Sequence, residues 1–157
     1  MKRYLAICIA AAVIGTLFVG CTQRIGDFTV ISSKNVEIGG KYKKLDGRFE
    51  GVDAKPIILG IPIGNPDLKQ AVDNCIEAGK GDFVANAVLE YAEWQVIIFG
   101  QRKYKVIGDV WAKASTSDLM NPQIELYELQ QASDGYRMVS LADPAKSVKV
   151  ESLYASR

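Results

Sequence analysis

The stretch PIILGIPIGNPDLKQAVDNCIEAGKG, residues 56–81, carries the strongest structural signals in this chain. It opens with an apolar run that is bounded and interrupted by Pro and Gly, which predicts a buried strand leading into a turn. Asn65-Pro66-Asp67 then supplies an N-cap, a proline at the first helical position and an acid in the first turn. A helix is therefore predicted to begin at this point.

The predicted helix has one apolar stripe, whose members recur at i, i+3, i+4, i+7 and i+8. They are Leu68, Ala71, Val72, Cys75 and Ile76. This stripe is expected to pack against a sheet, and Gly79 is expected to end the helix in a left-handed conformation. Cys75 lies on the apolar stripe, so we interpret it as a small buried core residue rather than a nucleophile.

The residues after the helix have the patterns of paired strands. Residues 83–91 alternate between apolar and other side chains, and 94–99 extend the sheet to a turn predicted at 100–102. Residues 104–111 then return as an antiparallel partner. The unit is β-α-β-β.

The flanking segments complete a single predicted domain, residues 28–143. A strand is expected at 28–33, a loop with a possible edge strand at 41–52, and a second hairpin from 124–129 and 136–141 across 133–135. The fold class is therefore α+β, a small mainly antiparallel sheet with one amphipathic helix and a C-terminal hairpin. The polar residues 144–157 are expected to form a loosely held tail.

The beginning of the chain has the pattern of a secretion signal. Met1-Lys2-Arg3 is a short cationic start, and Tyr4 to Val19 is a run of sixteen residues without a charge. A membrane-spanning helix needs about 20 apolar residues, so this run is too short for a permanent span. We predict a signal peptide over residues 1–20.

The end of this signal, Leu17-Phe18-Val19-Gly20-Cys21, resembles the lipobox of bacterial lipoproteins, with Phe18 where the family usually has Leu. The resemblance implies cleavage between Gly20 and Cys21, a diacylglycerol and an N-acyl chain on Cys21, and a lipidated tether over 21–27. Thr22 after the cysteine implies the outer membrane, with the domain at its periplasmic face. The alternative is an ordinary secretory signal that happens to end at a cysteine.

Charge and composition exclude several classes of function. Removing the signal takes Lys2 and Arg3 from the 19 basic residues, which leaves 17 basic against 18 acidic residues. So balanced a domain has no field that would attract nucleic acid. Histidine is absent, which excludes Ser-His and Cys-His pairs and His-based zinc sites. We expect no metal, and no cofactor besides the covalent lipid on Cys21.

Several groups of residues remain as candidates for function. The first is an interaction patch on the aromatic stretch, with a two-sided core as the alternative explanation; its residues are Trp94, Ile97, Phe99 and Trp111. The second is a basic group that a solvated surface also explains: Lys41, Lys43, Lys44, Arg48, Arg102, Lys103 and Lys105. The third is a set of carboxylates from which nothing selects a catalytic pair: Asp67, Asp73, Glu77, Asp82, Glu90, Glu93 and Asp109.

The leading hypothesis is a membrane-anchored envelope lipoprotein that is not an enzyme and acts as an accessory or assembly factor for another envelope protein. The layout is similar in outline to several groups of small uncharacterised envelope lipoproteins, a likeness of pattern that implies no activity. The second hypothesis is a carrier or sensor for a lipid or other apolar ligand, because of the aromatic stretch. The third is a small envelope hydrolase that uses two carboxylates.

Overall fold

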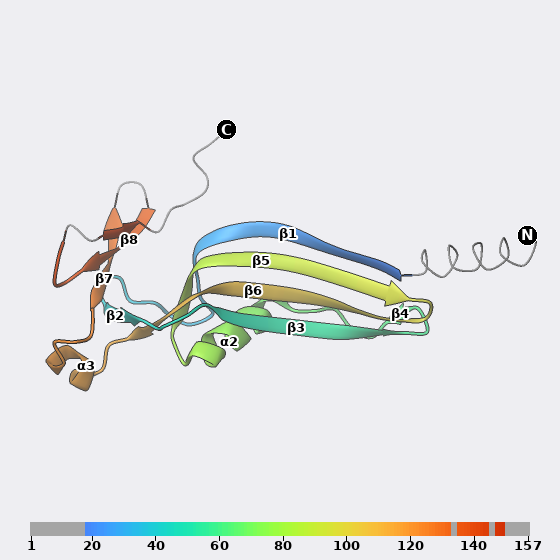
Figure 1. Cartoon of the computed structure of the whole chain (residues 1–157), viewed down its shortest axis with the longest axis horizontal. Helices are drawn as coiled ribbons and strands as arrows, with labels where there is room; N and C mark the ends of the chain where they lie inside the picture. The colour runs from blue at the N-terminus through green and yellow to red at the C-terminus, as the bar shows by residue number, and fades with distance from the viewer. Residues whose placement is uncertain (1–17, 133–134, 145–146, 150–157) are drawn as a thin grey trace, which may run out of the picture.

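Figure 1 shows a computed structural model of the chain, which describes residues 18–132, 135–144 and 147–149. Strands dominate these residues, and each pair of neighbouring strands is antiparallel. The structure confirms the predicted α+β class, a mainly antiparallel sheet with few helices. It also confirms the β-α-β-β unit and the hairpin that follows it, although the first strand of this hairpin is Tyr127–Ala132 rather than 124–129.

Four strands form a long arm that runs horizontally in Figure 1. Their order across the arm is β1 (Phe18–Ile31), β5 (Phe83–Val96), β6 (Phe99–Lys113) and β3 (Phe49–Ile58). The short strand β4 (Ile61–Pro62) folds back on the end of β3. The beginning of β1, the end of β5 and the β3–β4 turn lie together at the right-hand end of the arm in Figure 1.

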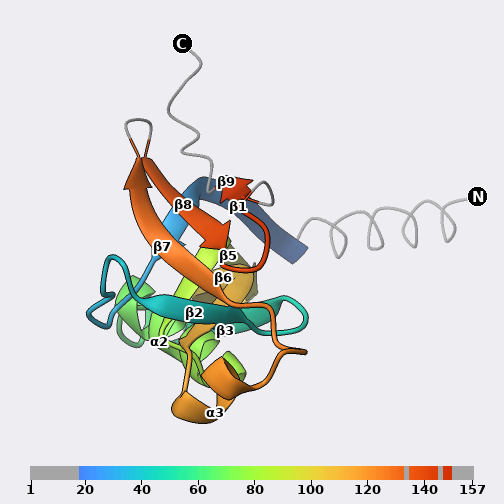
Figure 2. The same cartoon turned by 90° about the vertical axis from the view of Figure 1, so that its left-hand side faces the viewer.

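The opposite end of the sheet is built on the last residues of β6. There β6 pairs with β2 (Lys41–Lys44), and the sheet continues through three more strands, β7 (Tyr127–Ala132), β8 (Gly135–Ser140) and β9 (Ser147–Lys149). Figure 2 looks at this end, with α3 (Thr116–Met120) below the strands. The strand β6 therefore joins the long arm to a second, smaller part.

The helix α2 (Leu68–Gly79) lies against the long arm and buries the predicted stripe. Its buried residues pack against strands β5 and β6: Ala71, Val72, Cys75 and Ile76 contact Val84, Ala87, Leu89, Val106 and Val110. Close approach to β3 requires a glycine, because a Cβ on Gly51 would lie 2.2 Å from the carbonyl oxygen of Ala71.

A second core fills the smaller part, and it takes residues from the same strand β5. Its buried members are Tyr42, Phe83, Ala85, Trp111, Leu129 and Met138. The two cores lie on opposite faces of β5, with Phe83 and Ala85 on one face and Val84 on the other. A bulge between Ala85 and Val88 then shifts the alternation, so Ala87 and Leu89 join Val84 in the first core. Asn86 within this bulge has a positive φ of 50°. The alternation predicted over 83–91 is therefore broken at the bulge.

The ends of α2 differ from the prediction by a few residues. The N-cap is Asp67 rather than Asn65, because the Asp67 carboxylate accepts a hydrogen bond from the Lys69 amide at 2.8 Å. The left-handed residue after the helix is Lys80 rather than Gly79. Gly79 is needed for packing instead, since a Cβ there would lie 2.7 Å from the Val110 side chain.

Two predicted turns and loops are placed differently. The turn between β5 and β6 is at Ile97 and Ile98, not at residues 100–102. Much of the stretch 41–52, expected to be a loop, belongs to strands β2 and β3. The charged residues in this stretch favour a loop over a strand, but some form ion pairs with the neighbouring strand. Glu50 of β3, for example, lies 3.2 Å from Lys105 of β6.

The two ends of the predicted domain also differ from expectation. Residues 21–27, expected to form a tether, lie within β1 and pair with β5, so this polar segment is an edge strand. Part of the expected tail forms β9, which pairs with β8. Of the predicted signal, residues 1–17 lie outside the described residues, and 18–20 are the first residues of β1.

Candidate functional site

Two hairpin turns lie side by side at the end of the long arm. One turn, at Leu59 and Gly60, joins β3 to β4, and the other, at Ile97 and Ile98, joins β5 to β6. The Gly60 amide donates a hydrogen bond of 3.0 Å to the carbonyl oxygen of Ile98. Leu59, Gly60 and Ile97 have φ values of 53°, 76° and 55°, a region that favours Gly, Asn and Asp.

These turns and the strand ends beside them expose a cluster of large apolar side chains, which we call the apolar tip. Its members are Ile58, Leu59, Ile61, Ile63, Trp94, Ile97, Ile98 and Phe99. Leu59 and Ile97 at the apices are each 66% exposed, and Phe99 is 57% exposed. Scattered apolar residues on a surface need no explanation, but a contiguous apolar cluster marks a site of interaction.

The strand register aligns part of the apolar tip into one row across the arm. Val96 is opposite Phe99, Phe99 is opposite Ile58, and Ile58 is opposite Ile61. Residues directly opposite one another share a face of the sheet, and Trp94, two positions before Val96, shares it as well. This face is turned away from α2, and no helix within the described residues covers it.

The same register divides the arm into a charge-free end and a charged remainder. Residues 56–66 and 94–101 contain no charged side chain. The first charged row pairs Glu93 with Arg102 and Arg102 with Lys55, and it lies three residues behind the row of Phe99. At roughly 3.3 Å per residue, the uncharged end is about 10 Å deep.

Cys21 lies in this first charged row. It is exposed, and it is the partner of Glu93 in the β1–β5 pairing. The strand β1 begins three residues earlier, where Phe18 is opposite Val96. The predicted lipidation site and the apolar tip are therefore at the same end of the molecule.

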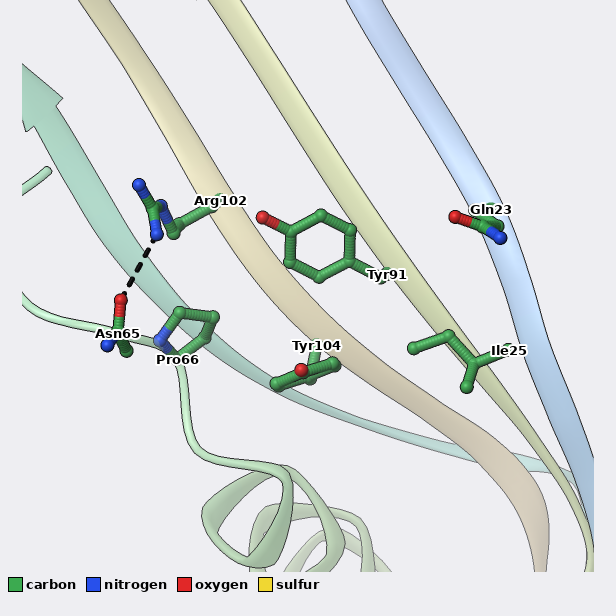
Figure 3. A pocket seen from close by; sticks show the side chains of 7 residues that line it. All are labelled: Gln23, Ile25, Asn65, Pro66, Tyr91, Arg102 and Tyr104. Atoms are coloured by element: carbon green, nitrogen blue, oxygen red, sulfur yellow. Dashed lines mark hydrogen bonds between the residues drawn. The ribbon is translucent and has the colours of Figure 1, made fainter. Parts of the chain in front are cut away.

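A groove opens on the other face of the arm, and it begins at Arg102 of the first charged row (Figure 3). Its volume is about 370 Å³, and it is lined by Gln23, Ile25, Asn65, Pro66, Tyr91, Arg102 and Tyr104. Arg102 donates a hydrogen bond of 3.1 Å to Asn65, while its Nε is buried and has no hydrogen-bond partner among the described residues. The groove thus combines a cationic group with aromatic walls.

The two tyrosines of the groove hold each other in place. Their ring centroids are 5.4 Å apart, and the Tyr91 hydroxyl donates a hydrogen bond of 2.5 Å to the Glu93 carboxylate. This hydrogen bond raises the pKa of Tyr91 above its ordinary value. The phenol therefore stays protonated at neutral pH and keeps its hydrogen bond to Glu93, a member of the charged row.

The structure brings together three of the four residues predicted for the interaction patch. Trp94, Ile97 and Phe99 belong to the apolar tip, so the two-sided core that would have explained them is wrong for these residues. Trp111 is 2% exposed and packs in the second core, stacked on Phe83. It lies at the opposite end of β6 and is not part of the patch.

The predicted basic group is spread along the sheet, with Arg48 near Ile107, between Lys44 and Arg102. Lys44 is opposite Trp111, nine residues from Arg102 along β6, which corresponds to about 30 Å. Lys43 and Lys44 form ion pairs with Asp118 and Asp109, at 2.8 Å and 3.2 Å. The basic residues do not form one patch.

Cys75 and most of the predicted carboxylates have structural roles. Cys75 is fully buried, which confirms it as a core residue, and burial raises the pKa of its thiol. Of the predicted carboxylates, Asp73 pairs with Lys69 at 2.7 Å and Asp67 caps α2. Among the described residues, no group of three or more Cys, Asp and Glu side chains is placed to hold a metal ion.

Sequence reasoning missed half of the apolar tip, because it placed the run from Ile57 to Ile63 inside a buried strand. Only Ile57 of its isoleucines is buried. The signal in the sequence was weak: a glycine, Gly60, within eleven residues that carry no charge. Which residues of this run are exposed could be identified only from the tertiary structure.

Comparisons with models of protein families, with curated proteins and with solved structures found no match to this chain. Within the residues described, no helix has the length and apolar composition needed to cross a membrane.

Proposed function

We propose that this chain is a lipoprotein of the bacterial envelope, anchored through lipid on Cys21 at the periplasmic face of the outer membrane. In this proposal the domain is not an enzyme, and it serves another envelope protein as an accessory or assembly factor. The observation that carries the proposal is the position of Cys21, exposed in the first charged row behind the apolar tip.

Lipid on Cys21 would leave the rest of the domain free for a protein partner. The second core and strands β7 and β8 lie at the end of the sheet opposite the apolar tip (Figure 1). Each buried methylene of an acyl chain contributes about 0.8 kcal/mol, and two or more chains make membrane attachment stable. Firm anchoring of one end would therefore keep the other end within reach of proteins in the same membrane.

The first experiment measures lipidation and partner binding together. The tagged full chain is expressed in a bacterial host, crosslinked mildly, solubilised and purified, with Cys21→Ser as the unlipidated control. We expect mass spectrometry to find cleavage before Cys21 and acyl chains on its peptide, and one envelope protein in stoichiometric amount. A mature chain without lipid on Cys21 would overturn the anchor, and lipidated chain that purifies alone would overturn the accessory role.

A second candidate function, a carrier or sensor for an amphiphilic ligand, is favoured by the groove behind the charged row. Its volume of about 370 Å³ is within the range of ligand sites. The test is lipid analysis of the purified chain beside the variant Tyr104→Trp, whose larger side chain fills the groove. A ligand lost specifically from this variant would support the carrier, and equal lipid content in both chains would count against it.

A further inference from the structure

We infer that the apolar tip itself enters the lipid surface, as a second membrane contact beside Cys21. It inserts to the depth of the charge-free rows, with Trp94 at the interface and the row of Lys55, Glu93 and Arg102 at the level of the headgroups. The inference extends the proposed function, on which it rests for the identity of the membrane. It concerns different residues, so the two can fail separately.

The chemistry of the tip suits lipid better than a folded partner. Its side chains are aliphatic and aromatic, and the surrounding residues 56–66 and 94–101 carry no charge. A protein interface normally has a polar rim around its apolar centre. Here the first charges lie behind the tip, in the row of Glu93, so the apolar surface ends in a boundary across the arm rather than a ring.

The depth of the charge-free end matches the depth at which proteins insert into a membrane interface. The uncharged rows extend for about 10 Å, at roughly 3.3 Å for each residue of a strand. Apolar faces that bind membranes are buried about 5–10 Å into the boundary between headgroups and acyl chains. The charged row and Cys21 would then lie at the surface, where a thioether-linked diacylglycerol must begin.

The chain that precedes the sheet points to lipid as the occupant of this end. Residues 4–19 are sixteen residues without a charge, and β1 joins the sheet where Phe18 is opposite Val96. If this run is removed, the acyl chains proposed for Cys21 take its place three residues farther along the same strand. With or without the signal, an apolar group is therefore joined to β1 at the same end of the arm as the apolar tip.

The residues at the turn apices support the same conclusion. Leu59 and Ile97 have positive φ values, which disfavour large side chains and particularly a β-branched one. Gly, Asn or Asp would fit these positions with less strain. A strained backbone conformation is found where the side chain is used, and here both side chains are two-thirds exposed at the end of the arm.

The test uses the fluorescence of the lipidated full chain in vesicles of equal parts phosphatidylcholine and phosphatidylglycerol. Brominated phosphatidylcholine quenches tryptophan at known depths. The variant Trp111→Phe leaves Trp94 as the reporter, and the matched variant Trp94→Phe leaves the buried Trp111. We expect Trp94 to lose intensity most strongly with bromine near the headgroups, and Trp111 to lose none. If Trp111→Phe does not fold, the difference between the wild-type chain and Trp94→Phe gives the same information.

Substitutions at the apices make the result specific to the apolar tip. The double variant Leu59→Asn, Ile97→Asn removes two exposed apolar side chains and places Asn where positive φ favours it, so the fold should be retained. We expect it to lose the quenching of Trp94. Met120→Asn is the control, because Met120 is 79% exposed in α3, at the other end of the sheet.

The possible outcomes separate the two proposals. If Cys21 carries lipid and bromine at any depth leaves Trp94 unquenched, the apolar tip stands clear of the membrane and the inference is wrong, while the proposed anchor stands. A blue-shifted but unquenched Trp94 would place the tip against protein, which also overturns the inference. If the wild-type chain carries no lipid on Cys21 and its Trp94 is still quenched, the tip inserts and the lipoprotein proposal fails.

Discussion

The amide of Gly60 donates a hydrogen bond of 3.0 Å to the carbonyl oxygen of Ile98, which joins the turns of two neighbouring hairpins. The pairing of β3 with β6 ends directly before it, where Ile58 is opposite Phe99. The two turns are therefore coupled through their backbones. A surface built from both hairpins is held at a defined place at the end of the arm.

Substitutions in the β3–β4 turn should change stability in opposite directions. Gly60→Ala places a side chain at a φ of 76°, and we expect a loss of about 1–2 kcal/mol from the left-handed conformation. Leu59→Asn should be neutral or stabilising, because Asn tolerates this region better than Leu. Denaturant unfolding followed by circular dichroism measures both. Gly47→Ala, with a φ of 91° and open space around it, is the control for backbone strain away from the tip.

The contact between α2 and β3 should not tolerate a side chain at Gly51. A Cβ there would lie 2.2 Å from the Ala71 carbonyl oxygen and from the Cys75 amide nitrogen, so the helix must move away from the sheet. We expect Gly51→Ala to lower the free energy of unfolding by about 1–3 kcal/mol, or more if the helix cannot adjust. Gly26→Ala, whose Cβ would meet its nearest neighbour at 3.9 Å, is the matched control. Equal stability of the two variants would contradict the packing described.

The two tryptophans should differ sharply in their effect on stability. Trp111 is stacked on Phe83, with ring centroids 6.2 Å apart, and it meets the edge of Tyr127 at 5.2 Å. Removing such a side chain by Trp111→Ala should lower the free energy of unfolding by about 3–5 kcal/mol. Trp94→Ala should change it by about 0.5 kcal/mol, because Trp94 is exposed. A large loss from Trp94→Ala would mean that the tip has a structural role.

The ion pair between Lys43 and Asp118 should make stability depend on acid. A hydrogen bond from Lys43, together with those from Ser115, lowers the pKa of Asp118 from 3.8 to about 2. A depressed pKa contributes stability that is present above the unfolded pKa and is lost as the pH falls toward the folded value. We therefore expect the melting temperature to fall between pH 4 and pH 2 by less in Asp118→Asn than in the wild type.

The matched control for this prediction is Asp46→Asn, since Asp46 makes no ion pair among the described residues. It should keep the acid sensitivity of the wild-type chain. Asp118→Asn should also melt at a lower temperature than the wild type near neutral pH, because the substitution removes the charge that pairs with Lys43. Identical melting curves for both variants across this range would show that the ion pair contributes nothing.

The thiol of Cys75 should be inert in the folded chain. It is fully buried, its sulfur donates a weak hydrogen bond of 3.4 Å to the Phe49 carbonyl oxygen, and burial raises its pKa. Maleimide labelling of the double variant Cys8→Ser, Cys21→Ser, in which Cys75 is the one remaining thiol, should therefore be slow at neutral pH until denaturant is added. Rapid labelling without denaturant would show that α2 separates readily from the sheet.

Local patterns were sufficient where a residue's neighbours in space are also its neighbours in sequence. The spacing of Leu68, Ala71, Val72, Cys75 and Ile76 predicted the buried face of α2, because a helix aligns these positions whatever surrounds it. The strand between the helix and the aromatic stretch was also predicted. Trp94, Ile97 and Phe99 were identified as a candidate surface from composition alone.

The turn positions and the polar strand β1 were not predicted correctly. The stretch 21–27 has no strong strand pattern, and it is extended because its backbone pairs with β5. The turn at Ile97 and Ile98 contains the residue types of a strand. Its position follows from the register of β5 on β6, in which Val96 is opposite Phe99 and two residues remain for the turn.

The sequence by itself determined the α2 stripe, the mainly antiparallel sheet and two uncharged runs, residues 56–66 and 94–101. Only the tertiary structure decided that these runs meet at one end, where their large apolar side chains are not covered by the other described residues. The 12 residues of α2 span about 18 Å at 1.5 Å each, whereas the 14 residues of β5 span about 46 Å. One short helix cannot cover the whole arm. An apolar run is therefore buried beneath α2 and exposed beyond it, although the local pattern of residues is the same.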